Sequence, residues 1–286
     1  MSEKVKIVAI TGPTATGKTA LAVKLAQLFD GEIISVESRQ VYRFMDLGTG
    51  KDLEEYDNVP YHLINIADPE KDTYNLSEFC RDAFAAIDLI RKKGKLPILC
   101  GGTALYLDAL LKGYRLPGAQ LPAREKGVAR STADYEAPPS FTPPFELDAL
   151  VIGVLFDRKV VRERIEKRLD ARFDAGMIDE VRALHDEKGV SYEKLEFFGL
   201  EYREIAFYLQ GKCTFEEMRQ SLLDKIRQFA KRQDIFFRKI ERSGQDIYWC
   251  RGGGEPDPRI LIEKFLAGET LPEITFRLAE VNYGKK

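Results

Sequence analysis

The segment Gly12-Pro13-Thr14-Ala15-Thr16-Gly17-Lys18-Thr19 has the residue types and spacing of a loop that binds phosphate groups. Its two glycines let the backbone wrap closely around an anion, so that successive N–H groups point inward. Lys18 offers a mobile ammonium to the outer phosphate, and the Thr19 hydroxyl is placed to hold Mg²⁺. The residues predicted to bind a diphosphate are Gly12, Thr14, Ala15, Thr16, Gly17, Lys18 and Thr19.

The sequence on either side of the loop supports this interpretation. An apolar stretch at 4–10 reads as a buried strand, and 16–29 reads as a helix. A chance match on a glycine-rich turn would not predict that context. Kinases and nucleotide hydrolases usually carry an acidic residue after a second strand. Here the predicted strand 96–100 is followed by glycines, and the acid at a strand end near the loop is Glu37. This pattern favours a reaction in which the bound diphosphate is the leaving group, rather than one in which a phosphoryl group is transferred.

The composition is that of an ordinary globular protein. The 286 residues are 44% hydrophobic and 31% charged, with a net charge of −2, so a basic surface for nucleic acid must be local. No apolar run is long enough to span a bilayer, and the N-terminus lacks the regions of a signal peptide, which predicts a cytoplasmic protein without membrane contact. No two cysteines have C-x-x-C spacing, so we expect no zinc site. We expect the four thiols to be buried and reduced: Cys80, Cys100, Cys213 and Cys250.

The order of predicted elements indicates an α/β fold. Strands expected at 4–10, 32–36, 61–66 and 96–100 alternate with helices at 16–29 and 75–93. Such alternation is typical of a parallel sheet wrapped by helices. We therefore predict a phosphate-loop α/β core over residues 1–113.

The rest of the chain divides into two parts. Prolines throughout residues 114–146 predict a short insertion or flap. Residues 147–286 then complete the core, with a strand at 149–156 and mostly helical sequence from 158 to 242. A last strand is expected at 246–250 and a last helix at 258–265.

Several further motifs follow the phosphate loop in a characteristic order. They are Ile33-Ile34-Ser35-Val36-Glu37-Ser38-Arg39-Gln40-Val41-Tyr42, Met45-Asp46-Leu47-Gly48-Thr49-Gly50-Lys51, Gly101-Gly102-Thr103-Ala104-Leu105-Tyr106, Arg164-Ile165-Glu166-Lys167-Arg168, Tyr202-Arg203-Glu204-Ile205 and Ala230-Lys231-Arg232-Gln233. In this order they resemble the tRNA dimethylallyltransferases, also called tRNA isopentenyltransferases. The resemblance covers most of residues 5–113 and 150–242.

The resemblance implies both a fold and an activity. The fold would be a nucleotide-kinase-like parallel sheet in which the phosphate loop binds an isoprenoid diphosphate. The activity would be transfer of a dimethylallyl group from dimethylallyl diphosphate to N6 of adenosine 37 in the tRNA anticodon stem-loop, with release of pyrophosphate and help from Mg²⁺. We expect the enzyme to be a monomer.

The resemblance also implies catalytic roles for Glu37, Thr103 and Arg168. An exocyclic adenine amine is a poor nucleophile, so it needs a carboxylate to orient it and take its proton. Glu37 matches this general base, where the family carries Asp; the alternatives are a magnesium-associated acid or a solvated one. Thr103 matches a residue beside the target base, and it is also placed to cap the helix at 104–112. Arg168 matches an arginine that contacts the diphosphate, and the role of Arg164 stays open.

The predicted tRNA contacts lie in two segments. Ser38, Arg39 and Gln40 match the family segment that touches the nucleotides; the alternative is a plain polar loop. Arg227, Lys231, Arg238 and Arg242 fall within about 60° of one another on a helix, which suits an RNA backbone or an ordinary solvated face. His62 and Asp68 are expected to make structural hydrogen bonds. The aromatic residues expected in the core are Phe197, Phe198, Phe207, Phe236 and Phe237.

Three departures from the family leave other functions open. The 114–146 segment is shorter than the family's helical insertion, Phe198-Gly199-Leu200-Glu201-Tyr202 replaces the usual Ile-Gly-Tyr, and Glu37 replaces Asp. One alternative is a small-molecule or nucleotide kinase with the same core. Another is a non-catalytic RNA-binding relative.

Overall fold

A parallel β-sheet forms the centre of the computed structural model, which describes residues 4–71, 73–116, 140–252 and 254–280. Within these residues the sheet has six strands in the order β3-β2-β4-β1-β5-β6, and all pairings are parallel. The strands are β1 (Val5–Thr11), β2 (Gly31–Ser35), β3 (Tyr61–His62), β4 (Leu96–Gly101), β5 (Leu147–Leu155) and β6 (Tyr248–Arg251). The predicted parallel sheet is confirmed.

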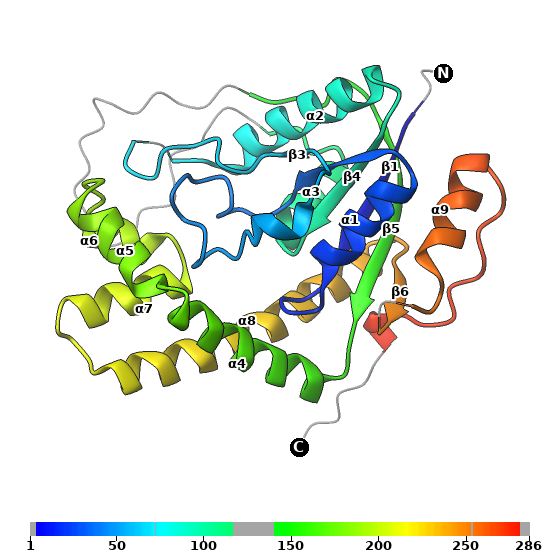
Figure 1. The fold of residues 1–286 in the computed structure, drawn as a ribbon. Helices are drawn as coiled ribbons and strands as arrows, with labels where there is room; N and C mark the ends of the chain where they lie inside the picture. Colours follow the sequence, from blue (N-terminus) through cyan, green and yellow to red (C-terminus); the bar gives the residue numbers. More distant parts are fainter. Residues whose placement is uncertain (1–3, 72, 117–139, 253, 281–286) are drawn as a thin grey trace.

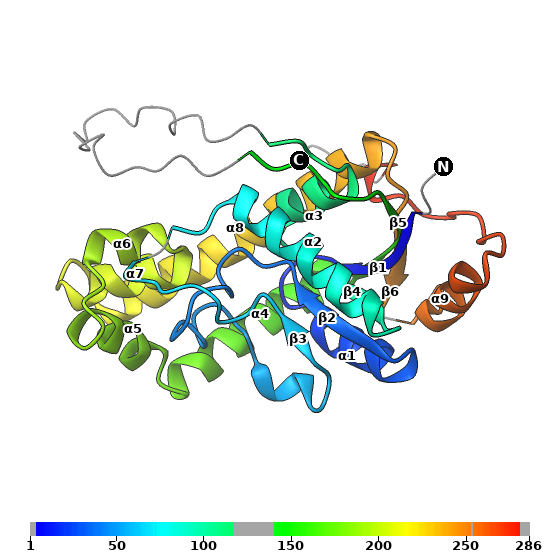
Figure 2. The same ribbon diagram turned by 90° about the horizontal axis from the view of Figure 1, so that it is seen from above.

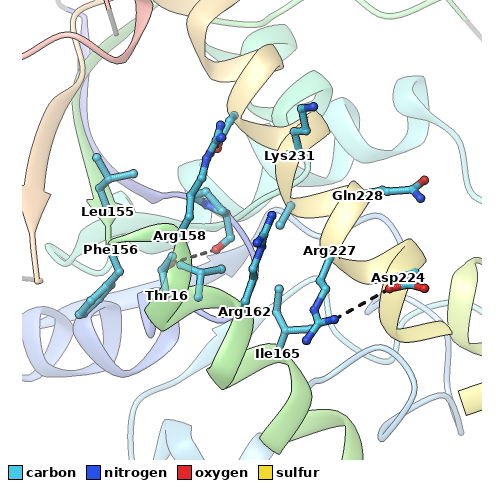
Figure 3. A pocket seen from close by; sticks show the side chains of 14 residues that line it. Thr16, Leu155, Phe156, Arg158, Arg162, Ile165, Asp224, Arg227, Gln228 and Lys231 are labelled. Atoms are coloured by element: carbon cyan, nitrogen blue, oxygen red, sulfur yellow. Dashed lines mark hydrogen bonds and ion pairs between the residues drawn. The ribbon is translucent and has the colours of Figure 1, made fainter. Parts of the chain in front are cut away.

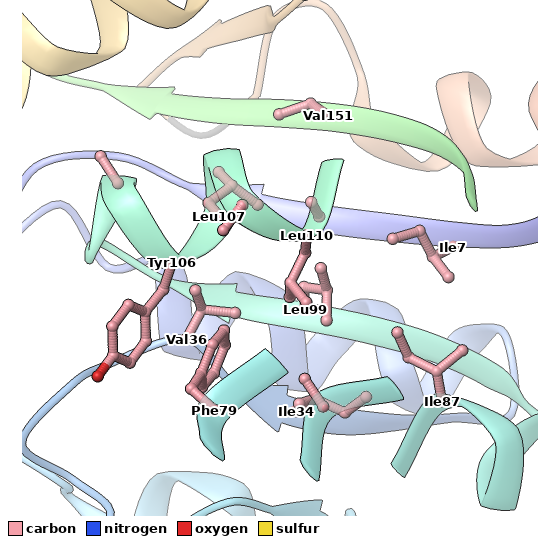
Figure 4. Packing of buried hydrophobic residues seen from close by; sticks show 14 of the residues in the cluster. Ile7, Ile34, Val36, Phe79, Ile87, Leu99, Tyr106, Leu107, Leu110 and Val151 are labelled. Atoms are coloured by element: carbon pink, nitrogen blue, oxygen red, sulfur yellow. The ribbon is translucent and has the colours of Figure 1, made fainter. Parts of the chain in front are cut away.

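Helices cover both faces of this sheet. Successive side chains of a strand point to opposite faces, so Ile7 packs toward α2 (Leu76–Lys92) and α3 (Ala104–Leu111), whereas Val8 packs toward α1 (Lys18–Leu28) and α9 (Pro258–Ala267). Figure 4 shows the first of these interfaces, in which Phe79, Ile87, Leu107 and Leu110 lie against strand residues such as Leu99 and Val151. Burial on both faces explains why the strands read as continuous apolar runs.

A helical region follows β5 and builds a second core beside the sheet. It contains α4 (Arg158–Asp174), α5 (Met177–Asp186), α6 (Tyr192–Phe197), α7 (Leu200–Leu209) and α8 (Phe215–Arg242), and the short helices elsewhere are η1 (Leu53–Tyr56) and η3 (Leu278–Glu280). In both ribbon views α5, α6 and α7 form a lobe at one end of the molecule, with α9 at the other (Figure 1 and Figure 2). The predicted helical stretch 158–242 is therefore confirmed, and its long α8 starts at a capping box between Thr214 and Glu217.

Some local predictions were wrong or lie outside the described residues. The strand expected at 61–66 ends at His62, because Leu63 and Asn65 have left-handed φ angles of 62° and 59° that no strand tolerates. Cys213 is half-exposed rather than buried. Most of the predicted flap, residues 117–139, lies outside the described residues, although Leu116 and Phe141 pair at its base. Where the chain is described, no helix has the length and apolar composition of a membrane span.

Two polar residues of uncertain role make structural hydrogen bonds, as expected. The His62 ring lies 2.8 Å from Oε2 of Glu32, whose side chain is almost fully buried. Asp68 accepts a hydrogen bond from the backbone N–H of Glu70 at 2.9 Å. The first contact joins β3 to β2, and the second is local to the loop that follows β3.

The contact between Gly153 and Trp249 provides a test of the packing of β5 on β6. A Cβ at Gly153 would lie 2.3 Å from the indole ring, which is buried and whose Nε1 donates to Glu241 at 2.8 Å. We expect Gly153→Ala to lower the free energy of unfolding by about 1–3 kcal/mol, since overpacking displaces the ring. Urea unfolding measures the change. Gly254→Ala, where a Cβ meets nothing within 4 Å, is the matched control, and equal stability of both variants would contradict this packing.

Candidate active site

Three loops meet at the carboxyl ends of three neighbouring strands. The phosphate loop follows β1, Glu37 follows β2, and Gly102 and Thr103 follow β4, which lies between the other two strands. Together with residues of α4, α7 and α8 these loops line a cleft of about 830 Å³. The structure therefore brings most of the predicted catalytic and diphosphate-binding residues into one place.

The phosphate loop has the tight curvature that its glycines predict. Gly12 has a φ of +149°, and a Cβ there would lie 2.5 Å from the carbonyl oxygen of Val154. Gly17 adopts a left-handed conformation immediately before α1, whose N-terminus faces the loop with its partial positive charge. Lys18 and Thr19, at the start of this helix, line the cleft. The Thr16 hydroxyl instead donates to the Pro13 carbonyl at 2.9 Å and is buried.

The Glu37 carboxylate lies beside the phosphate loop and is held by several donors. Its Oε1 accepts the Gly102 N–H at 2.7 Å and lies 3.3 Å from Lys18 Nζ. Its Oε2 accepts the Thr103 hydroxyl at 3.1 Å. Thr103 occupies the N-cap position of α3, but its side chain makes no capping bond; its oxygen accepts the Ser38 N–H at 3.1 Å instead. The Thr103 hydroxyl therefore orients Glu37 rather than the helix.

Arg168 of α4 lines the same cleft and contacts the phosphate loop. Its Nη2 donates to the Thr14 hydroxyl. Burial, together with the neighbouring Arg172, lowers the pKa of Arg168 to about 10, so the guanidinium stays charged at neutral pH. Arg172 pairs with Asp52 at 3.2 Å. Arg164, the residue with an open role, lies over the Phe156 ring at 4.0 Å and also lines the cleft.

Arg39 and Gln40, which were predicted to touch nucleotides, have different surroundings. Arg39 lies 4.9 Å from the centre of the Phe197 ring and donates to the Phe197 carbonyl at 3.0 Å. Gln40 is buried, with its amide bonded to Ser35 at 2.7 Å and to the Gly50 carbonyl at 3.0 Å. Gln40 therefore uses both ends of its amide within the protein, and its contact with a base stays a prediction.

Two exposed aromatic residues of the cleft were missed by the sequence analysis. Phe197 was expected in the core, but it is 59% exposed and lies against Arg39 at the wall of the cleft. Phe229 of α8 is also exposed and lines the same cleft. Phe198 and Phe237 are buried as expected. The sequence shows two adjacent phenylalanines at 197–198, and only the turn into α7 decides which of them faces outward.

Arg227 and Lys231 lie in a second pocket on the other side of the phosphate loop. This pocket, of about 570 Å³, is lined by Pro13 and Thr16 and by residues of α4 and α8. Figure 3 shows Arg227 and Lys231 on α8 and Arg158 and Arg162 on α4, with the Arg227 guanidinium directed toward Asp224. Arg227 pairs with Glu166 of α4 at 2.9 Å, whereas Lys231 is exposed. Two members of the predicted basic stripe, Arg227 and Lys231, therefore border a pocket separate from the one that contains Glu37.

Thr19, Asp52 and Glu55 supply oxygen donors to one cleft, and these suit a magnesium ion that a substrate also binds. Asp52 and Glu55 line the same cleft as the Thr19 hydroxyl. Burial and the charge of Asp52 raise the pKa of Glu55. Among the described residues no cluster of three or more His, Cys, Asp or Glu side chains could hold a metal ion by itself. Mg²⁺ is typically bound by one or two carboxylates and substrate phosphates, so the donor set suits an ion carried by a diphosphate.

Comparison with known proteins gives one consistent family. A family model described as IPP transferase matches residues 40–141 and 128–240, and one described as isopentenyl transferase matches residues 5–58. tRNA dimethylallyltransferase 1 of Geotalea daltonii is 44% identical over 87% of this chain and 92% of its own length. tRNA dimethylallyltransferase 2 of Phocaeicola vulgatus is 44% identical over 86% and 92%.

Solved structures show the same fold. The full-length tRNA isopentenylpyrophosphate transferase of Bacillus halodurans superposes with a TM-score of 0.73 at 30% identity, covering 93% of this chain and 96% of that one. A eukaryotic dimethylallyltransferase acting on tRNA superposes with a TM-score of 0.77 at 21% identity, covering 94% and 81%.

The contact between Arg168 and the phosphate loop predicts that Arg168 strengthens the binding of pyrophosphate. A charge-assisted hydrogen bond contributes about 1.5–3 kcal/mol, so we expect Arg168→Met to weaken pyrophosphate binding by roughly 10- to 150-fold. Isothermal titration calorimetry measures the affinity. Arg182→Met, at an exposed arginine of α5 that pairs with Asp179, is the control and should bind normally. Unchanged affinity in the Arg168 variant would remove this residue from the site.

Proposed function

The chain belongs to the tRNA dimethylallyltransferase family and is therefore a prenyltransferase that acts on tRNA, and we propose that it transfers a dimethylallyl group from dimethylallyl diphosphate to N6 of adenosine 37 beside the anticodon. The observation that supports this most directly is the position of the Glu37 carboxylate, 3.3 Å from the phosphate-loop lysine Lys18. A base and a diphosphate cradle at this separation suit a reaction in which one substrate loses a proton while the other loses pyrophosphate.

Glu37 is the general base of the proposed reaction. Its Oε1 already accepts from Gly102 and contacts Lys18, whereas Oε2 accepts only the Thr103 hydroxyl among the hydrogen bonds described. A carboxylate oxygen has two lone-pair sites, so Oε2 has the capacity to accept a proton from the adenine amine. Thr103 keeps this oxygen oriented, because its hydroxyl is fixed by the Ser38 N–H.

The phosphate loop and Arg168 stabilise the leaving group. As the bond between N6 and C1 of the dimethylallyl group forms, the bond between C1 and the diphosphate oxygen breaks, and N6 gives its proton to Glu37. Negative charge then develops on the departing pyrophosphate. Lys18, Arg168 and the first residues of α1 line the same cleft, and their N–H groups and positive charges would stabilise that charge.

Thr19, Asp52 and Glu55 would hold a Mg²⁺ ion carried by the diphosphate. When bound, the ion would neutralise charge on the phosphate oxygens. The chain's own contribution is a set of hard oxygen donors that line the same cleft as Lys18.

Aromatic and basic side chains support binding of the RNA. Single-stranded bases are commonly recognised by stacking on aromatic rings and on guanidinium planes. Phe197, Arg39 and Phe229 offer such surfaces at the wall of the cleft. We propose that an unstacked adenosine of the anticodon loop is received there, and that Lys231 contacts the RNA backbone outside the cleft.

Substitution of Glu37 tests the proposed reaction. Incubation with labelled dimethylallyl diphosphate and unmodified tRNA should place the label in the RNA. General-base catalysis contributes about 10²–10⁴-fold, so Glu37→Gln should lower kcat by that range. Pyrophosphate affinity should not fall, because the amide keeps the size of the side chain and removes a negative charge beside Lys18.

Other outcomes of the same experiment identify the alternatives. Release of phosphate from ATP without label in the RNA would indicate a kinase. Binding of tRNA that is unchanged by Lys18→Ala, with no label transferred by the wild-type chain, would indicate a non-catalytic RNA-binding protein. Glu54→Gln, at an exposed glutamate of η1, is the matched control and should transfer label at the wild-type rate.

Lys231 allows a separate test of RNA binding. Loss of one phosphate contact should weaken tRNA binding and reduce the slope of log affinity against log salt by roughly 0.7–0.9. We therefore expect Lys231→Ala to raise the Kd for tRNA and flatten its salt dependence, with pyrophosphate affinity unchanged. Filter binding at several salt concentrations gives both quantities. Lys24→Ala, at an exposed lysine of α1, is the control, and an identical slope for the two variants would argue against an RNA contact at Lys231.

A further inference from the structure

Gln233 connects the two halves of the reaction site. The residue lies on α8 at the end of the Ala230-Lys231-Arg232-Gln233 motif, and its side chain is buried. Its Oε1 accepts the backbone N–H of Thr14 in the phosphate loop at 2.9 Å. Its Nε2 donates to the carbonyl of Gly102 at 2.9 Å. One amide therefore joins the loop after β1 to the turn after β4.

The Gly102 peptide is consequently held from both sides. Its carbonyl accepts from Gln233, and its N–H donates to Glu37 Oε1 at 2.7 Å. A continuous chain of hydrogen bonds therefore runs from Thr14 through Gln233 and Gly102 to Glu37. It does not pass through Lys18, so it sets the separation of the loop and the carboxylate independently of that ion pair.

We infer that Gln233 is a positioning residue that fixes the distance between the general base and the diphosphate cradle, an inference that rests on the proposed prenyl transfer. The amine, the allylic carbon and the departing oxygen must be aligned, and a misplacement of about 1 Å can cost on the order of 10²-fold in rate. The Thr14 N–H already donates to Gln233, and one N–H makes one good hydrogen bond. Thr14 therefore contributes to the anion site through its hydroxyl, which is bonded to Arg168, and not through its N–H.

The chemistry of this position requires an amide of glutamine length. The side chain must accept at one end and donate at the other. Methionine has a similar length but offers neither function well, whereas glutamate can accept from Thr14 but can donate to Gly102 only when it is protonated. These two substitutions therefore separate the length of the side chain from its hydrogen bonds.

The test measures single-turnover transfer of labelled dimethylallyl groups at saturating tRNA, with pyrophosphate and tRNA affinities measured in parallel. Gln233→Met should lower the single-turnover rate by roughly 10- to 100-fold and leave both affinities close to wild type. Gln233→Glu should be slow at neutral pH. Its rate relative to wild type should rise as the pH falls, because the protonated carboxyl can donate to Gly102; a purely structural role would not produce this profile.

The control and the contrary outcomes are distinct. Gln220→Met, at an exposed glutamine of the same helix, should transfer at the wild-type rate. If wild type transfers label and Gln233→Met keeps the wild-type rate, the inference is overturned while the proposed function stands. If wild type transfers no label, both are overturned. Should Gln233→Met fail to fold, the pH profile of Gln233→Glu decides, and a ratio to wild type that does not vary with pH would contradict the inference.

Discussion

The parallel pairing of β2, β4 and β1 is the constraint on which the site depends. Parallel neighbours end at the same edge of a sheet, so the loops that follow them must converge. In this chain those loops carry Glu37, the Gly102 turn and the phosphate cradle, which are separated by tens of residues in sequence. The central position of β4 places Gly102 between the other two loops, where its N–H donates to Glu37 and its carbonyl is linked to the phosphate loop through Gln233 of α8.

Charge is concentrated at this edge although the chain as a whole is nearly neutral. The net charge is −2, yet Lys18, Arg168 and Arg172 approach the same cleft. Arg168 remains a cation despite the burial that lowers its pKa to about 10. Charges held in a partly desolvated cleft act more strongly than the same charges in water. The arrangement therefore suits a group that develops negative charge as it leaves.

Helix α8 serves both the chemistry and the surface that we assign to RNA. Lys231 and Gln233 are two residues apart, and at about 100° per residue they point to opposite sides of the helix. Gln233 is accordingly buried against the phosphate loop, and Lys231 is exposed beside the second pocket. A helix that is itself packed by Met218, Leu222 and Phe237 gives both side chains a rigid base.

The sequence by itself determined the parallel α/β core, the phosphate loop and the helical region, because these depend on local apolar periodicity and on glycine spacing. It also indicated Glu37, Thr103 and Arg168 through ordered motifs. Tertiary structure alone decided that Phe197 is exposed while Phe198 is buried, that Gln40 is bonded inward, and that Arg227 and Lys231 border a separate pocket. The link through Gln233 was also decided by tertiary structure alone. The two partners of this buried amide, Gly102 and Thr14, lie 131 and 219 residues away in the chain, and no local sequence pattern encodes such contacts.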